Sequence, residues 1–148
     1  MPAIVSGARS STIARFLDTN VLLYAISGAD EEAAKAMRAR ELLEARDLAV
    51  SVQVLQEFYV QATRSSRVDR ISHEQAIGLI ESWSRFIVAD ITLATMWDAL
   101  ETRERFRISY RDALIIAAAR AMRCSVVLSE DLSDGQDYRG VRVENPFG

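Results

Sequence analysis

Short runs of β-branched and aromatic residues alternate along this chain with longer stretches in which apolar residues recur at helical spacing. Short strands are predicted at residues 14–18, 48–51, 86–90, 125–129 and 141–144. Strands that alternate with helices of this length form βαβ units, which place the strands in a parallel sheet with helices on both faces. The sequence therefore predicts a single α/β domain.

Polar residues that favour helix N-termini precede the helical stretches. Helix starts are predicted at Asp30, Ser51, Ser72, Thr92 and Ser109. The first of these helices is expected to run to about residue 46. Ser72 and Gln75 have the spacing of a capping box, as do Ser109 and Asp112. Residues 113–119 are apolar all round, so the helix that carries them should be buried against the sheet.

Length and composition are those of one globular domain without a membrane segment. The 148 residues are 49% apolar and 26% charged, and no apolar run approaches the roughly 18 residues of a membrane-spanning helix. Residues 1–12 lack the basic start and long apolar stretch of a secretory signal. We interpret residues 1–13 as a flexible N-terminal extension and residues 14–148 as the domain. The single Cys124 favours a buried thiol in the reducing cytoplasm.

Asp18 stands between two apolar runs, residues 16–17 and residues 21–24, which should both be buried. A carboxylate in such a place costs several kcal/mol unless something compensates its charge. No Lys or Arg lies within residues 16–24 to pair with it. A bound divalent cation would compensate the charge, because Mg²⁺ selects carboxylate oxygens as ligands.

Three further acidic residues are predicted to lie at the same edge of the sheet as Asp18. Asp131 follows the strand at 125–129, Asp112 lies in the first turn of the buried helix, and Glu57 lies about two turns into the helix that Ser51 begins. Ligands of open parallel sheets bind outside the carboxyl ends of the strands. Singly, these three residues are explained as a turn residue, a helix cap and a solvated side chain. Together with Asp18, they predict a metal site.

The charge of the chain permits RNA binding without requiring it. The formal net charge is −3, and Lys35 is the only lysine among 18 basic residues. Several arginines lie near Glu57 or Asp112 in sequence: Arg64, Arg67, Arg70, Arg103, Arg105, Arg107 and Arg111. Arginine suits bidentate phosphate recognition, but arginines also line solvated helix faces. Both interpretations stay open.

The sequence lacks the residues that several other classes of enzyme require. His73, the one histidine, and Cys124 have no catalytic partners nearby in sequence, which disfavours Ser/His/Asp and Cys/His hydrolases. Neither a P-loop nor a Gly-x-Gly-x-x-Gly turn is present. A haloacid-dehalogenase-like phosphatase would need Asp where Asn20 stands, and a receiver domain would need a lysine late in the chain, after Lys35.

Four segments carry a resemblance to a known family. They are Phe16-Leu17-Asp18-Thr19-Asn20-Val21-Leu22-Leu23-Tyr24, Ser51-Val52-Gln53-Val54-Leu55-Gln56-Glu57-Phe58, Ser109-Tyr110-Arg111-Asp112-Ala113-Leu114-Ile115 and Leu128-Ser129-Glu130-Asp131-Leu132. In order and spacing the chain resembles PIN-domain ribonucleases over residues 14–147, most closely the VapC-type toxins of bacterial type II toxin–antitoxin modules. The resemblance implies a PIN-like three-layer α/β/α sandwich with a short central parallel sheet.

The resemblance also implies the site. Its catalytic acids would be Asp18, Glu57, Asp112 and Asp131. Asp18 and Asp112 would bind one or two Mg²⁺ or Mn²⁺ ions, which activate a water for attack on phosphorus. Asn20 would orient Asp18 by hydrogen bonding, and Ser129 takes the position that the family fills with Thr or Ser. Glu130 adjoins Asp131, and the sequence leaves open which of the two faces the site.

The partners implied by the resemblance are an RNA substrate, a cognate antitoxin and a second copy of the chain. The resemblance implies a hydrophobic groove for the antitoxin. Candidates for that groove or for a dimer contact are Phe58, Tyr59, Trp83 and Trp97, although core packing explains each of them singly. The function expected is that of a metal-dependent endoribonuclease toxin in the cytoplasm. The alternative is a non-catalytic PIN-like module that binds RNA or protein, although such a module would usually lose some of the four acids.

Overall fold

Five parallel strands form the central sheet of the protein, whose computed structural model describes residues 14–148. They are β1 (Arg15–Leu17), β2 (Leu48–Ser51), β3 (Ile87–Ala89), β4 (Val126–Leu128) and β5 (Arg142–Glu144). Their order across the sheet is β3-β2-β1-β4-β5, and all neighbouring strands in this order are parallel. β1 is therefore the central strand. The extension predicted at residues 1–13 lies outside the described residues.

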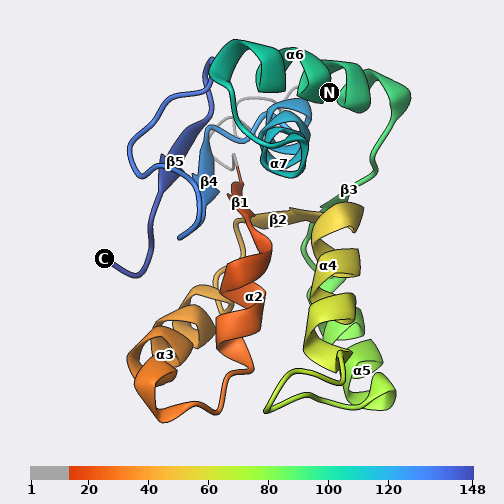
Figure 1. Cartoon of the computed structure of the whole chain (residues 1–148), viewed down its shortest axis with the longest axis vertical. Coiled ribbons are helices and arrows are strands. Elements are labelled where there is room, and N and C mark those ends of the chain that lie inside the picture. Colours follow the sequence, from red (N-terminus) through yellow and green to blue (C-terminus); the bar gives the residue numbers. More distant parts are fainter. Residues whose placement is uncertain (1–13) are drawn as a thin grey trace, which may run out of the picture.

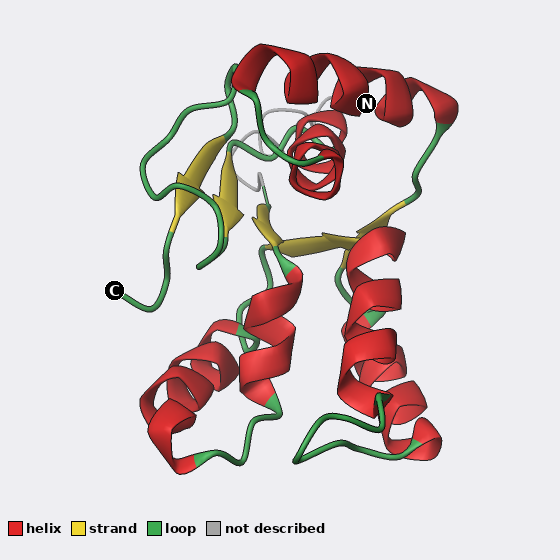
Figure 2. Cartoon of the chain, viewed as in Figure 1, coloured by secondary structure: helices red, strands yellow, loops and turns green. Residues whose placement is uncertain are grey.

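Helices cover both faces of this sheet (Figure 1, Figure 2). On one face lie α6 (Leu93–Phe106) and α7 (Tyr110–Ala121), which pack against each other. The helices on the other face are α2 (Thr19–Ala25), α3 (Ala33–Leu42), α4 (Val52–Thr63) and α5 (His73–Trp83). A short 3₁₀ helix, η1 (Asp30–Glu32), leads into α3. The predicted three-layer α/β/α sandwich is confirmed.

The core lies between the sheet and these helices. Phe16, Leu17 and Val127 on the two central strands are fully or almost fully buried. Residues 113–119 of α7 are also all buried, as their apolar pattern predicted. A helix that is buried on every side holds its first turn in a fixed place, so α7 can position the side chains that begin it.

Four of the five predicted helix caps are formed as side-chain hydrogen bonds. The hydroxyls of Ser51, Ser72, Thr92 and Ser109 each accept a backbone N–H at the start of α4, α5, α6 and α7. At α5, the side chain of Gln75 also accepts the backbone N–H of Ser72, which completes the capping box.

Asp30 is not a cap, because the N-cap of η1 is Ala29, which makes no side-chain hydrogen bond. The capping box predicted for Ser109 and Asp112 is only half formed, since the Asp112 carboxylate accepts from Arg111 instead of from the Ser109 N–H.

The predicted elements differ from the structure in two further places. The helix expected from Asp30 to about residue 46 begins as η1 and ends at Leu42. The next turn is tighter than an α-helix, with hydrogen bonds from the Glu44 and Ala45 N–H groups to the carbonyls three residues earlier, and Arg85 donates to the Leu43 carbonyl left free at this end. The apolar run at 21–24, for which no element was predicted, belongs to α2.

Cys124 and His73, which the sequence disfavours as catalytic residues, have the following surroundings. Cys124 is buried, and burial raises the pKa of its thiol to about 11. The Nδ1 atom of exposed His73 lies 2.8 Å from the hydroxyl of Tyr59.

Within residues 14–148, no helix combines the length and the apolar character that crossing a membrane requires.

Replacing Ser72 by Ala is expected to lower the free energy of unfolding by about 1 kcal/mol, because the Gln75 N–H at the start of α5 loses its acceptor. Urea denaturation measures the change. Ser66→Ala is the matched control, since Ser66 is exposed in a turn outside any helix. Equal stability of the two variants would contradict the role of the cap.

Candidate active site

Asp18 lies at the carboxyl end of the central strand β1 and has no exposed surface. It is the N-cap of α2, and its Oδ1 accepts a hydrogen bond of 2.7 Å from the backbone N–H of Thr19. Its Oδ2 accepts one of 2.7 Å from the hydroxyl of Ser129, which follows β4. The predicted burial of Asp18 is confirmed, and it also caps a helix.

Arg111 brings three of the four predicted acids together. Its Nη2 lies 2.6 Å from Asp18 Oδ1 and 2.8 Å from Glu57 Oε1. Its Nη1 lies 3.0 Å from Asp112 Oδ1. The carboxylates come from the end of β1, the middle of α4 and the first turn of α7, so one guanidinium joins three elements of the fold.

Glu57 and Arg111 are both charged at neutral pH. Burial alone would raise the pKa of Glu57, but hydrogen bonds from Arg111 and Thr19 outweigh burial and lower it. Burial alone would lower the pKa of Arg111. The contacts with Glu57, Asp18 and Asp112 outweigh it, so the pKa of Arg111 is raised above its ordinary value.

The fourth predicted acid, Asp131, is joined to Asp18 through a polar bridge. Asn20 Nδ2 lies 3.1 Å from Asp131 Oδ2, 3.3 Å from Ser129 Oγ and 3.5 Å from Asp18 Oδ2. Ser129 Oγ in turn accepts the backbone N–H of Asp131 at 3.1 Å. Asn20 and Ser129 therefore hold the two carboxylates on one side of the site, and Asp131 does not contact Arg111.

The neighbouring Glu130 turns to a different part of the molecule. Its carboxylate accepts hydrogen bonds from the Tyr24 hydroxyl and from the ammonium of Lys35, on α2 and α3. Only its backbone N–H contacts the bridge, through a hydrogen bond of 3.3 Å to Asn20 Oδ1. Of the two adjacent acids, Asp131 is the one whose side chain contacts Asn20 in the acidic cluster.

Two residues of the cluster, Thr19 and Arg111, were not predicted. The hydroxyl of Thr19 donates to Glu57 Oε1 at 2.7 Å, which ties α2 to α4. The signal for Arg111 was its position directly before Asp112 in the first turn of α7, which places its backbone at the same edge of the sheet. Asp18 needed a cation, and Arg111 is the nearest basic residue to any of the four acids in sequence.

The donor set of the cluster fits a hard divalent cation. Asp18, Glu57 and Asp112 supply carboxylate oxygens, which Mg²⁺ and Mn²⁺ prefer, and one guanidinium balances only one of their three charges. The oxygens surround a group larger than a metal ion, and accordingly no set of three acidic, His or Cys side chains among the described residues has metal-binding spacing. These residues could hold a metal ion after a local rearrangement.

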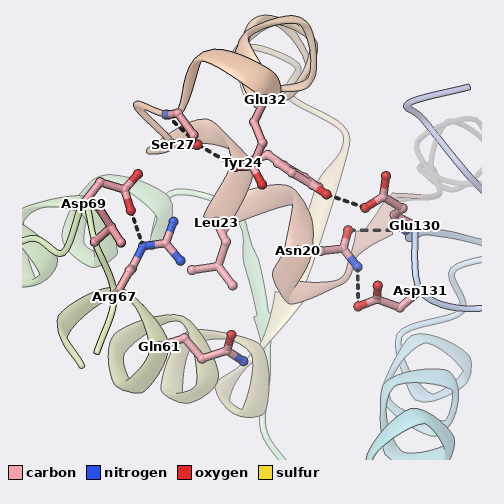
Figure 3. Close-up of a pocket in the computed structure, with 12 residues that line it drawn as sticks. Asn20, Leu23, Tyr24, Ser27, Glu32, Gln61, Arg67, Asp69, Glu130 and Asp131 are labelled. Carbon is pink, nitrogen blue, oxygen red and sulfur yellow. Dashed lines mark hydrogen bonds and ion pairs between the residues drawn. The ribbon is translucent and has the colours of Figure 1, made fainter. Parts of the chain in front are cut away.

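A pocket of about 430 Å³ opens beside the cluster (Figure 3). Asn20 and Asp131 form the side of the pocket next to the acids. Leu23 of α2 and Gln61 of α4 contribute an apolar wall and an amide, and Arg67 lies at the far side, paired with Asp69 at 3.0 Å. Of the four predicted acids only Asp131 lines this pocket, and Glu130 lines it as well.

Comparison with protein families matches the PIN domain to residues 15–133 of the chain. A search of curated proteins finds no match. Several solved structures share the fold at low sequence identity.

A toxin–antitoxin complex from Klebsiella pneumoniae contains a chain that is 21% identical, with a TM-score of 0.65, and the match covers 90% of this chain and 98% of the other. DNA-bound VapBC from Salmonella typhimurium has the same identity and coverages, with a TM-score of 0.63. VapC20 of Mycobacterium tuberculosis, described as a toxin that cleaves the sarcin-ricin loop, is 21% identical over 80% of this chain and 90% of its own, with a TM-score of 0.64.

Replacing Ser129 by Ala is expected to lower the free energy of unfolding by about 2 kcal/mol, because the buried Asp18 Oδ2 loses its shortest hydrogen bond and the N–H groups of Asp131 and Leu132 lose their acceptor. Chemical denaturation measures the loss. Ser129→Thr keeps the hydroxyl and should lose less, and Ser125→Ala, at an exposed position, is the control. A Ser129→Ala variant as stable as the control would refute the role of this hydroxyl.

Proposed function

The chain belongs to the PIN domain family, and we propose that it is an endoribonuclease that depends on Mg²⁺ or Mn²⁺ and acts as the toxin of a toxin–antitoxin pair. The observation that carries the proposal is the meeting of Asp18, Glu57 and Asp112 around a single positive charge at the carboxyl end of the central strand. Structural needs alone do not bring three carboxylates from three elements to one point, because each added charge costs desolvation energy.

The roles of the residues follow from their places. Asp18, Glu57 and Asp112 would hold the metal, and Asp131 is linked to Asp18 through the Asn20 amide. When bound, the metal supplies an activated water and neutralises the charge that develops on the phosphate.

The surrounding residues fix the geometry of these acids. Ser129 and the Thr19 N–H hold the two oxygens of Asp18, and the Thr19 hydroxyl orients Glu57.

The toxin role is supported by the solved relatives, which include chains from toxin–antitoxin complexes. A cognate antitoxin and a second copy of the chain are the protein partners that we propose, in the cytoplasm. Phe58 and Trp83 are buried and pack edge to face at 4.7 Å, so they belong to the core. Trp97 is 61% exposed on α6, which leaves it available for such a contact.

A non-catalytic PIN-like module that binds RNA or protein is the alternative. Such a module has no use for a carboxylate cluster that exceeds its counter-charge. The formal excess of negative charge around Arg111 therefore favours the enzyme, and loss of activity in the variants below separates the two.

Asp18→Asn and Asp112→Asn are each expected to lower the rate of RNA cleavage at least about 100-fold. Replacing a residue that only hydrogen-bonds to a metal ligand already lowers metal affinity or activity roughly 10–100-fold. The assay incubates the purified full chain with total bacterial RNA and maps the new ends. EDTA should stop cleavage and Mn²⁺ should restore it.

Asp90→Asn, at an exposed position before α6, is the matched control, and circular dichroism confirms that each variant is folded. Undiminished cleavage by either folded variant would refute the assignment of the acids, and EDTA-resistant cleavage would refute the dependence on metal.

Asp131→Asn and Glu130→Gln should differ in the same assay. Asp131 contacts Asn20 within the cluster, so its replacement is expected to slow cleavage by about tenfold. Glu130 contacts Lys35 and Tyr24 instead, so its replacement should leave the rate unchanged. The reverse order of effects would show that Glu130 serves the site.

A further inference from the structure

The guanidinium of Arg111 lies among the three carboxylates to which the proposed function assigns the metal. We propose that Arg111 is a built-in competitor of the metal ion: its guanidinium balances the three carboxylates while the site is empty of metal, and it must leave before Mg²⁺ or Mn²⁺ can bind. This inference rests on the proposed function, because it concerns the metal of the same site.

The contacts leave no room for both cations at once. All three nitrogens of the guanidinium donate to carboxylates: Nε to Glu57, Nη1 to Asp112 and Asp18, and Nη2 to Asp18 and Glu57. A metal ion would bond to the same oxygens at about 2.1 Å. It would then lie against the guanidinium, and two adjacent positive groups with shared ligands repel each other.

The charges explain why a divalent ion can displace the arginine. Three carboxylates around one guanidinium leave a formal excess of two negative charges. Mg²⁺ carries twice the charge of the guanidinium and is far more compact, so it balances the cluster better. The guanidinium nevertheless gives up several charge-assisted hydrogen bonds when it leaves, and this loss weakens the apparent affinity for the metal.

The guanidinium can leave without any change in the backbone. The Asp112 N–H is held by the Ser109 cap, and the Arg111 carbonyl accepts a hydrogen bond of 3.3 Å from Gln53. The side chain of Arg111 is 32% exposed, whereas that of Asp18 is fully buried. Rotation about the bonds of the Arg111 side chain therefore carries its head group into solvent while the three acids stay in place.

The test compares metal binding by the full chain and by Arg111→Gln, which keeps most of the side-chain length and removes the charge. Titration with Mn²⁺, followed by the paramagnetic resonance signal of the free ion, measures affinity without any need for activity. Arg111→Gln is expected to bind Mn²⁺ at least about tenfold more tightly, which corresponds to about 1.4 kcal/mol. Arg103→Gln removes an exposed arginine of α6 and should bind Mn²⁺ as the unchanged protein does.

Thermal unfolding supplies a second readout of the same competition. Without metal, Arg111→Gln leaves three carboxylates uncompensated and should melt at a lower temperature, by more than about 5 °C. Saturating Mn²⁺ should then raise its melting temperature more than that of the unchanged protein. Arg111→Lys keeps one charge but cannot bridge three carboxylates, so it should fold without metal and bind Mn²⁺ with intermediate affinity.

The outcomes separate this inference from the proposed function. If folded Arg111→Gln and Arg111→Lys bind Mn²⁺ no more tightly than the unchanged protein, while Asp18→Asn abolishes binding, the competition is refuted and the metal site stands. If the unchanged protein and both variants fail to bind Mn²⁺ and fail to cleave RNA, the proposed function is refuted as well.

Discussion

The carboxylate of Asp18 is buried at the end of the central strand, and a charge in that place must be balanced by the groups around it. Each neighbouring element supplies one of those groups: α2 its first N–H, the segment after β4 the Ser129 hydroxyl, and α7 the guanidinium of Arg111. The parallel order of the sheet makes this possible, because it brings the carboxyl ends of β1, β2 and β4 to one edge. The need to balance one charge thus ties together elements from both faces of the sheet.

Much of this fold and site could be predicted from sequence because the signals were local. The five strands lie within one residue of their predicted ends, and the caps at Ser51, Ser72, Thr92 and Ser109 depend on residues three positions apart. The acids of the cluster were predictable for the same reason, since each is tied to the end of a strand or the first turns of a helix. The length of α3 was not, because residues 43–46 keep a helix-forming composition while the chain already turns toward β2.

The counter-ion of Asp18 could not be found by local reasoning. The apolar runs that flank Asp18 contain no basic residue, and its partner Arg111 lies 93 residues away in sequence. Of the seven arginines near the acids, Arg111 alone adjoins one of them, Asp112, and the packing of α7 against the sheet brings its guanidinium to Asp18 as well. The choice between Glu130 and Asp131 was equally long-range, because it depends on Lys35 and Tyr24 holding one of the two adjacent carboxylates.

The fold alone does not establish what this protein does, since chains about 21% identical share an architecture without having to share a chemistry. The imbalance of the carboxylate cluster supports the proposed nuclease: one guanidinium contacts three buried or half-buried carboxylates and leaves them with an excess of negative charge. A cluster built only for stability would be neutral, because residual charge in a partly buried place is a cost without a return. The divalent cation that we propose for this site would balance the excess, and Arg111 contacts the same three acids that would bind it.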